Sequence, residues 1–157
     1  MLNKLEKAKS SWGGRSETID KWLQERQSLL IKYCDLAGLN QPDASKLPTA
    51  NDVSDFCAVL MDYISAGHFE VYEMLVSDDE AGIQLKRTVY PQIAQTTDNA
   101  LRFNDHFAEA LSAEQAKNFD SELADLGNVL EERFALEDRL IHHMHQKTKS
   151  DNTLTSA

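Results

Sequence analysis

Apolar residues recur every three or four positions along most of the chain, the spacing that places side chains on one face of an α-helix. Segments with this pattern cover residues 16–38, 49–77, 83–111 and 112–147. No alternation of apolar and polar residues is long enough to predict a strand. Four amphipathic helices joined by short or moderate loops predict an all-α fold, an antiparallel-type four-helix bundle.

The two ends of the chain extend this bundle. Leu2 and Leu5, ahead of the break at Gly13–Gly14, predict a short extra N-terminal helix. We expect a single helical domain over residues 1–150 and a disordered tail at residues 151–157.

Capping residues mark the expected ends of the helices. Ser16 suits the N-cap of the first helix, and Gly38 suits its C-terminal stop. Thr49 and Asp52 have the spacing of a capping box at the start of the second helix, and Ser112 opens the fourth helix in the same way.

Two residues interrupt the helical pattern. Gly67 lies inside the second segment, where glycine costs about 1 kcal/mol relative to alanine, and it predicts a kink or the close approach of another backbone. Pro91 predicts a break in the third segment, with a short helix at residues 83–90 and a longer one that begins at Pro91.

The second helix sorts its residues into two faces when it is wound at about 100° per residue. Its apolar face comprises Val53, Phe56, Cys57, Leu60, Ile64, Gly67, Val71, Met74 and Leu75. The acids fall together within an arc of roughly 80° on the other side: Asp52, Asp55, Asp62, Glu70 and Glu73. Phe69 lies beside the acids, although it is a large aromatic residue.

Charge is concentrated in the same part of the chain. Residues 47–85 contain eight acidic residues and no Lys or Arg, and the whole chain has a net charge of −10. A solvated acidic face and a docking surface for a basic partner are the two interpretations. The negative charge argues against direct binding to nucleic acid, whose phosphates require Lys and Arg.

Composition limits the remaining classes of protein. The chain has no apolar run of 18 residues and no signal-peptide core, so we expect a cytoplasmic protein without a membrane span. Cys34 and Cys57 both fall on apolar faces, which favours two buried thiols over a disulfide or a nucleophile. Glycine-rich phosphate loops, nucleophile elbows and zinc motifs are missing, so we expect neither an enzyme nor a cofactor.

The fourth helix carries charged residues inside its apolar stripe. Glu137 falls at the centre of the stripe and Arg133 near it. Because a buried unpaired Glu costs several kcal/mol, Glu137 requires a partner inside the bundle, for which Arg133, Arg26 and His68 are candidates. A buried polar network, a polar cavity that helps to shape a partner site, and a metal site are the three interpretations.

The metal interpretation has a superficial basis. His68 and Glu73 on one helix, with Glu132, Glu137 and the His142–His145 cluster on another, resemble the ligands of hemerythrin-type bundles. The three histidines of the cluster point in different directions on the helical wheel, however, and Glu132 faces away from the stripe. We therefore expect no metal ligands, and we keep a metal-binding hemerythrin-like bundle as an alternative.

Three blocks of the sequence resemble the regulator-of-sigma-D family (Rsd/AlgQ). The longest runs from Asp55 to Glu73 as DFCAVLMDYISAGHFEVYE, the second is LEERFALEDRLI from Leu130 to Ile141, and the third combines the opening MLN with DKWL at residues 20–23. The resemblance spans nearly the whole chain. The chain departs from the family pattern mainly at His142–His145, in the loop at residues 39–50 and in the tail.

The resemblance implies an anti-sigma factor. Members of the family bind the primary sigma factor of RNA polymerase, chiefly its C-terminal domain, which reads the −35 element, and so favour alternative sigma factors in stationary phase. Such a DNA-reading domain is basic where it meets phosphates, which suits an acidic partner. Asp62 matches an acidic position of the family motif, and the helical wheel adds the other residues expected to bind the partner: Asp55, His68, Phe69, Glu70 and Glu73. An acidic helical adaptor for another signalling protein is a further alternative, and a second signalling protein is a possible additional partner.

Overall fold

The computed structural model describes residues 17–38, 49–108 and 113–155. Within these ranges the elements are α2 (Glu17–Leu36), α3 (Ala50–Ala66), the π-helical turn η1 (Gly67–Val71), α4 (Tyr72–Leu75), α5 (Glu80–Phe107) and α6 (Ala113–Thr155). They contain no strand, and the predicted all-α bundle is confirmed. The predicted N-terminal helix lies outside the described residues.

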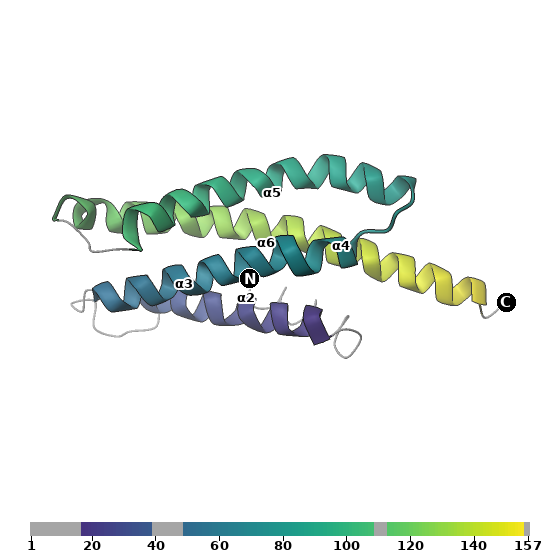
Figure 1. The fold of residues 1–157 in the computed structure, drawn as a ribbon, viewed down its shortest axis with the longest axis horizontal. Helices are drawn as coiled ribbons and strands as arrows, with labels where there is room; N and C mark the ends of the chain where they lie inside the picture. The colour runs from purple at the N-terminus through teal and green to yellow at the C-terminus, as the bar shows by residue number, and fades with distance from the viewer. Residues whose placement is uncertain (1–16, 39–48, 109–112, 156–157) are drawn as a thin grey trace.

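The helices alternate in direction along the bundle. Figure 1 shows α2 beside α3 and α5 beside α6, with each long helix antiparallel to the one before it. Aromatic pairs contribute to the core: Trp22 stacks on Tyr63 with ring centroids 5.5 Å apart, and Phe107 meets Phe119 edge to face at 5.3 Å. None of the described helices combines the length and apolar character that a membrane span requires.

Local signals set two of the helix ends as predicted. The Thr49 hydroxyl accepts from the Asp52 amide at 3.1 Å, and the Asp52 carboxylate accepts from the Thr49 amide at 3.2 Å, which completes the capping box of α3. Gly38 follows α2 with a φ of +73°, the left-handed conformation that glycine adopts at low cost. The predicted caps Ser16 and Ser112 lie outside the described residues.

The irregularity expected at Gly67 takes the form of the π-helical turn η1. A π turn holds about one residue more than an α turn, so the residues after it are rotated back by about 100° relative to a regular helix. Tyr72 and Val76 are therefore buried, whereas Met74, which the regular wheel placed in the core, is 45% exposed. The close neighbour of Gly67 is not another backbone but the Tyr72 hydroxyl, which would lie 3.0 Å from a Cβ atom added at Gly67.

The predicted break at Pro91 is wrong, because α5 continues from Glu80 through Pro91 to Phe107. Pro91 removes one backbone N–H and crowds the carbonyl one turn earlier, at Arg87. Both residues are exposed, so water can solvate that carbonyl. The helix accommodates the ring within a gentle arch, visible in Figure 1.

The fourth helix is also longer than predicted. α6 continues to Thr155, about two turns beyond its expected end at Lys147 and into the tail for which disorder was predicted. Neither Gly nor Pro occurs after Gly127, so nothing in the sequence terminates the helix. Figure 1 shows this end of α6 extending past the other helices.

Candidate functional site

The interior of the bundle brings together three charged residues that the sequence placed on apolar faces. Arg26 of α2 is 2% exposed, and Arg133 and Glu137 of α6 are fully buried. The Arg26 Nη2 atom lies 3.3 Å from Glu137 Oε1, and Arg133 Nε lies 3.4 Å from Glu137 Oε2. Arg26 also binds Asp138 through Nη1 at 2.7 Å. One carboxylate thus faces two guanidinium groups.

Two tyrosines complete the network. The Tyr63 and Tyr72 hydroxyls each donate to one oxygen of Glu137 at 2.5 Å. Arg26 Nε donates to the Tyr63 hydroxyl at 3.0 Å, and Arg133 Nη2 donates to the Tyr72 hydroxyl at 2.8 Å. Both carboxylate oxygens are therefore hydrogen-bonded, which a buried ion pair requires if it is not to be strongly destabilising.

The protonation states agree with this assignment of donors. Burial raises the pKa of Tyr63 and of Tyr72, with a further contribution from Glu137, so both phenols stay protonated and donate. Burial alone would lower the pKa of Arg26, but Tyr63, Glu137 and Asp138 raise it, so the guanidinium stays charged. Sequence reasoning missed both tyrosines, because their contact with Glu137 depends on which helices pack together and, for Tyr72, on the π turn.

His68 joins the edge of this network from the π turn. Its Nε2 atom lies 2.9 Å from Thr97 Oγ1, which accepts from Arg133 Nη1 at 2.8 Å. The imidazole also meets the Tyr72 ring edge to face, with centroids 5.1 Å apart. Burial lowers the pKa of His68, Arg133 lowers it further, and Glu137 partly opposes them. His68 therefore links the π turn to α5, whereas the ion pairs with Glu137 are formed by Arg26 and Arg133.

The π turn also presents an exposed aromatic side chain. Phe69 is 87% exposed, the highest value among the exposed large hydrophobic residues of the described chain. Asp62 and Glu70 are exposed as well, on α3 and in the turn. Asp55 is exposed about two turns before Asp62. We call Asp62, Phe69 and Glu70 the acidic–aromatic face.

A carboxylate from α2 adds to this face. Burial raises the pKa of Glu25, Lys21 partly opposes it, and the neighbouring carboxylates of Asp62 and Glu70 raise it further. The Glu25 Oε2 atom is buried without a hydrogen-bond partner among the described residues. Sequence reasoning missed Glu25 because its contribution depends on how α2 packs against α3.

Glu73 lies apart from the other acids. Its carboxylate accepts from Lys86 at 3.1 Å and from the Tyr90 hydroxyl at 3.3 Å, and both donors lie on α5. The regular wheel placed Glu73 in one arc with Asp62, but the extra residue of the π turn directs it towards α5.

The remaining candidate ligands do not form a common metal centre. Within the described ranges, no three His, Cys, Asp or Glu side chains could hold one ion together. In the cluster at the end of α6, His143 Nε2 lies 2.9 Å from Ser77 Oγ, whereas His142 is exposed. Cys34 and Cys57 are free thiols, half-buried and buried respectively.

Comparisons of the sequence with known proteins show the family to which the chain belongs. The family profile described as "Regulator of RNA polymerase sigma(70) subunit, Rsd/AlgQ" matches residues 1–145. The chain is 34% identical over 148 residues to the Regulator of sigma D of Yersinia enterocolitica, covering 90% of this chain and 88% of the relative. It is 36% identical over 146 residues to the Regulator of sigma D of Salmonella arizonae, covering 90% of each. The chain therefore belongs to the Rsd/AlgQ family of regulators of the sigma(70) subunit of RNA polymerase.

Proposed function

We propose that this protein is an anti-sigma factor that binds the C-terminal, −35-reading domain of the primary sigma factor. Binding lowers the use of that sigma factor by RNA polymerase and favours alternative sigma factors in stationary phase. The observation that carries the proposal is the acidic–aromatic face, where Phe69 is 87% exposed beside Asp62 and Glu70. The proposal is specific to this domain of sigma, beyond the regulation of sigma(70) that defines the family.

Phe69 supplies the apolar part of the contact. A phenylalanine that is almost fully exposed gains about 2 kcal/mol when a partner buries it. The π turn restricts the backbone conformation of Phe69, because the residues on both sides are helical and Val71 anchors the turn in the core. Phe69 therefore has the features of a central interface anchor.

The carboxylates supply the charge complementarity. Burial raises the pKa of Glu25, and the nearby carboxylates of Asp62 and Glu70 raise it further. A cation bound between the three carboxylates relieves their repulsion. A helix-turn-helix domain carries Lys and Arg where it meets DNA phosphates. An acidic partner bound there competes with DNA for the same basic surface.

The other predicted contact residues occupy secondary positions in this proposal. Asp55 extends the negative surface along α3 by about 10 Å from Asp62. His68 and Glu73 hold the turn against α5 through Thr97 and Lys86, so their role in binding is to position Phe69.

Binding of the isolated C-terminal domain of the primary sigma factor, measured by isothermal titration calorimetry, tests the proposal. We expect Phe69→Ala to weaken binding by about 30-fold, equivalent to about 2 kcal/mol, and Asp62→Arg to weaken it by at least tenfold. Leu101→Ala and Glu131→Arg are matched controls, because both positions are exposed on other helices. Higher salt should weaken the wild-type complex.

Two results would count against the proposal. Binding of full-length sigma without binding of its C-terminal domain would place the contact elsewhere on sigma. Equal effects of the test variants and their controls would show that the acidic–aromatic face is not the docking surface.

A further inference from the structure

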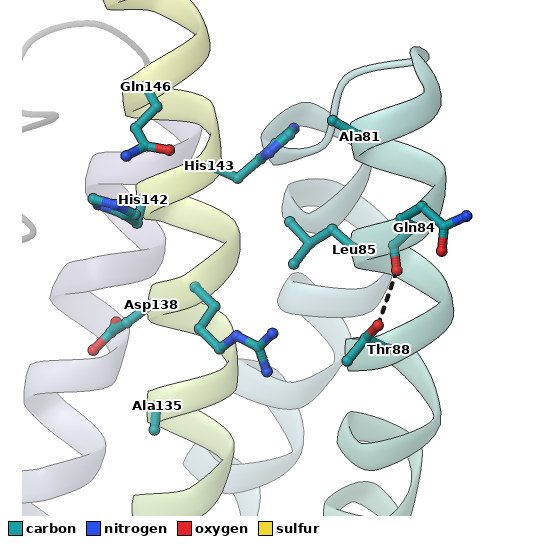
Figure 2. Close-up of a pocket in the computed structure, with 10 residues that line it drawn as sticks. Ala81, Gln84, Leu85, Thr88, Ala135, Asp138, His142, His143 and Gln146 are labelled. Carbon is teal, nitrogen blue, oxygen red and sulfur yellow. Dashed lines mark hydrogen bonds between the residues drawn. The ribbon is translucent and has the colours of Figure 1, made fainter.

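A groove separates the first half of α5 from the second half of α6, on residues that the proposed function does not use (Figure 2). Its volume is about 550 Å³, within the range of pockets that bind small molecules. Figure 2 shows His143 and Leu85 between the two helices, with Gln84 on the α5 side.

The groove has an unpaired positive charge. Arg139 lines it, is exposed, and has no hydrogen-bond or ion-pair partner among the described residues. The one carboxylate in the lining, Asp138, is already bound to Arg26 at 2.7 Å. Two imidazoles also line the groove: His142 is exposed, and His143 Nε2 lies 2.9 Å from Ser77 Oγ.

The start of α5 borders the groove, because Ala81 in its first turn belongs to the lining. The partial positive charge of this helix end is already met by the Asp79 carboxylate, which accepts from the Gly82 amide at 3.0 Å. Arg139 therefore supplies the positive charge that the groove offers to a ligand.

The surrounding acids restrict the size of the occupant. An extended polyanion such as nucleic acid would have to cross the exposed carboxylates of Asp78 and Glu80, which precede and begin α5. A small anion avoids this repulsion. The groove also suits a hydroxylated organic group next to Arg139, because its lining includes the amides of Gln84 and Gln146 and the side chain of Leu85.

We propose that this groove binds a small phosphate monoester, with Arg139 and His142 on the phosphate and the glutamine amides on the hydroxylated group. A guanidinium fork matches phosphate oxygens in two parallel hydrogen bonds. A sugar phosphate and a nucleoside monophosphate share this chemistry. The proposal is independent of sigma binding, because no groove residue belongs to the acidic–aromatic face.

Titration of the ¹⁵N-labelled full-length protein with glucose 6-phosphate and with AMP, followed by NMR, tests the proposal. We expect one of the two esters to bind with a Kd below about 1 mM, with shifts in the amides of Gln84, Arg139 and His143. Glucose and adenosine, which lack the phosphate, are the matched ligands and should not produce these shifts.

A pair of arginine variants locates the contact. Arg139→Gln should weaken binding at least tenfold, as expected for the loss of a charge-assisted pair. Arg102→Gln, at an exposed position in the second half of α5, should change the Kd less than twofold. Three results would overturn the proposal: no binding of either ester up to about 10 mM, equal binding of adenosine and AMP, or equal effects of the two arginine variants.

Discussion

Replacement of Glu137 by Gln removes one negative charge from the interior and keeps the volume of the side chain. In the native network Glu137 accepts from Tyr63 and Tyr72 and faces both guanidinium groups. An amide retains one acceptor oxygen and turns an N–H donor towards the second phenol. Arg26 keeps the carboxylate of Asp138, but the other hydrogen bonds of Arg133 end on uncharged hydroxyls.

The expected loss of stability follows from this uncompensated arginine. Removal of one partner of a buried ion pair costs about 3–5 kcal/mol. With a urea m-value of about 2 kcal/mol/M, a loss of about 4 kcal/mol lowers the unfolding midpoint by about 2 M. Far-UV circular dichroism follows the transition, and Glu132→Gln, exposed on the same helix, should change it by less than about 0.5 kcal/mol. A shift of less than about 0.5 M for Glu137→Gln would refute this account.

A double-mutant cycle separates an uncompensated charge from a general packing defect. Arg133→Met removes the guanidinium that Glu137→Gln leaves without its anion. The double variant should therefore be more stable than the sum of the single effects predicts, with a coupling energy of about 1–3 kcal/mol. Additivity within about 0.5 kcal/mol would show that Arg133 and Glu137 do not depend on each other.

Two further predictions concern the connection to α5 and the π turn. Gly82→Ala places a Cβ 1.8 Å from the Ser77 carbonyl oxygen, so the backbone must shift; we expect a loss of about 1–3 kcal/mol in thermal unfolding, and an unchanged melting temperature would contradict the close contact. The pKa of His68 is lowered from 6.5 by burial and by Arg133, so the folded state binds fewer protons than the unfolded state. The stability that His68 contributes is present above about pH 6.5 and is lost as the pH falls from there through the lower pKa of the folded state. Urea midpoints between pH 5.5 and 7.5 should therefore depend on pH less in His68→Gln than in the wild type, and parallel profiles would argue against the shift.

Periodicity and capping predicted the helices where local interactions decide the outcome. The α3 capping box and the Gly38 stop depend on residues within one turn, so their spacing was sufficient. Pro91 failed as a breaker because the buried face of α5 continues on both sides of it, with Val89 before it and Ile93 after it. A lone proline on the solvent face removes one hydrogen bond, and the buried face of a 28-residue helix outweighs that loss.

The candidate site could be predicted only in part. Arg26, Arg133 and Glu137 stood out because charged residues inside an apolar stripe need partners. The identity of those partners, Tyr63 and Tyr72, depends on which helices pack together, which periodicity does not encode. Glu25 was missed for the same reason.

The π turn explains the largest error and connects the two parts of the site. In a regular helix Tyr72 would lie away from the core and Glu73 would lie among the acids. The extra residue of η1 turns Tyr72 inwards onto Glu137 and directs Glu73 to Lys86 on α5. Phe69 is left exposed in the middle of the same turn. Because π turns are rare and short, we expect the hydrogen bonds of Tyr72 and Glu73 on its C-terminal side to help to hold the turn that presents Phe69.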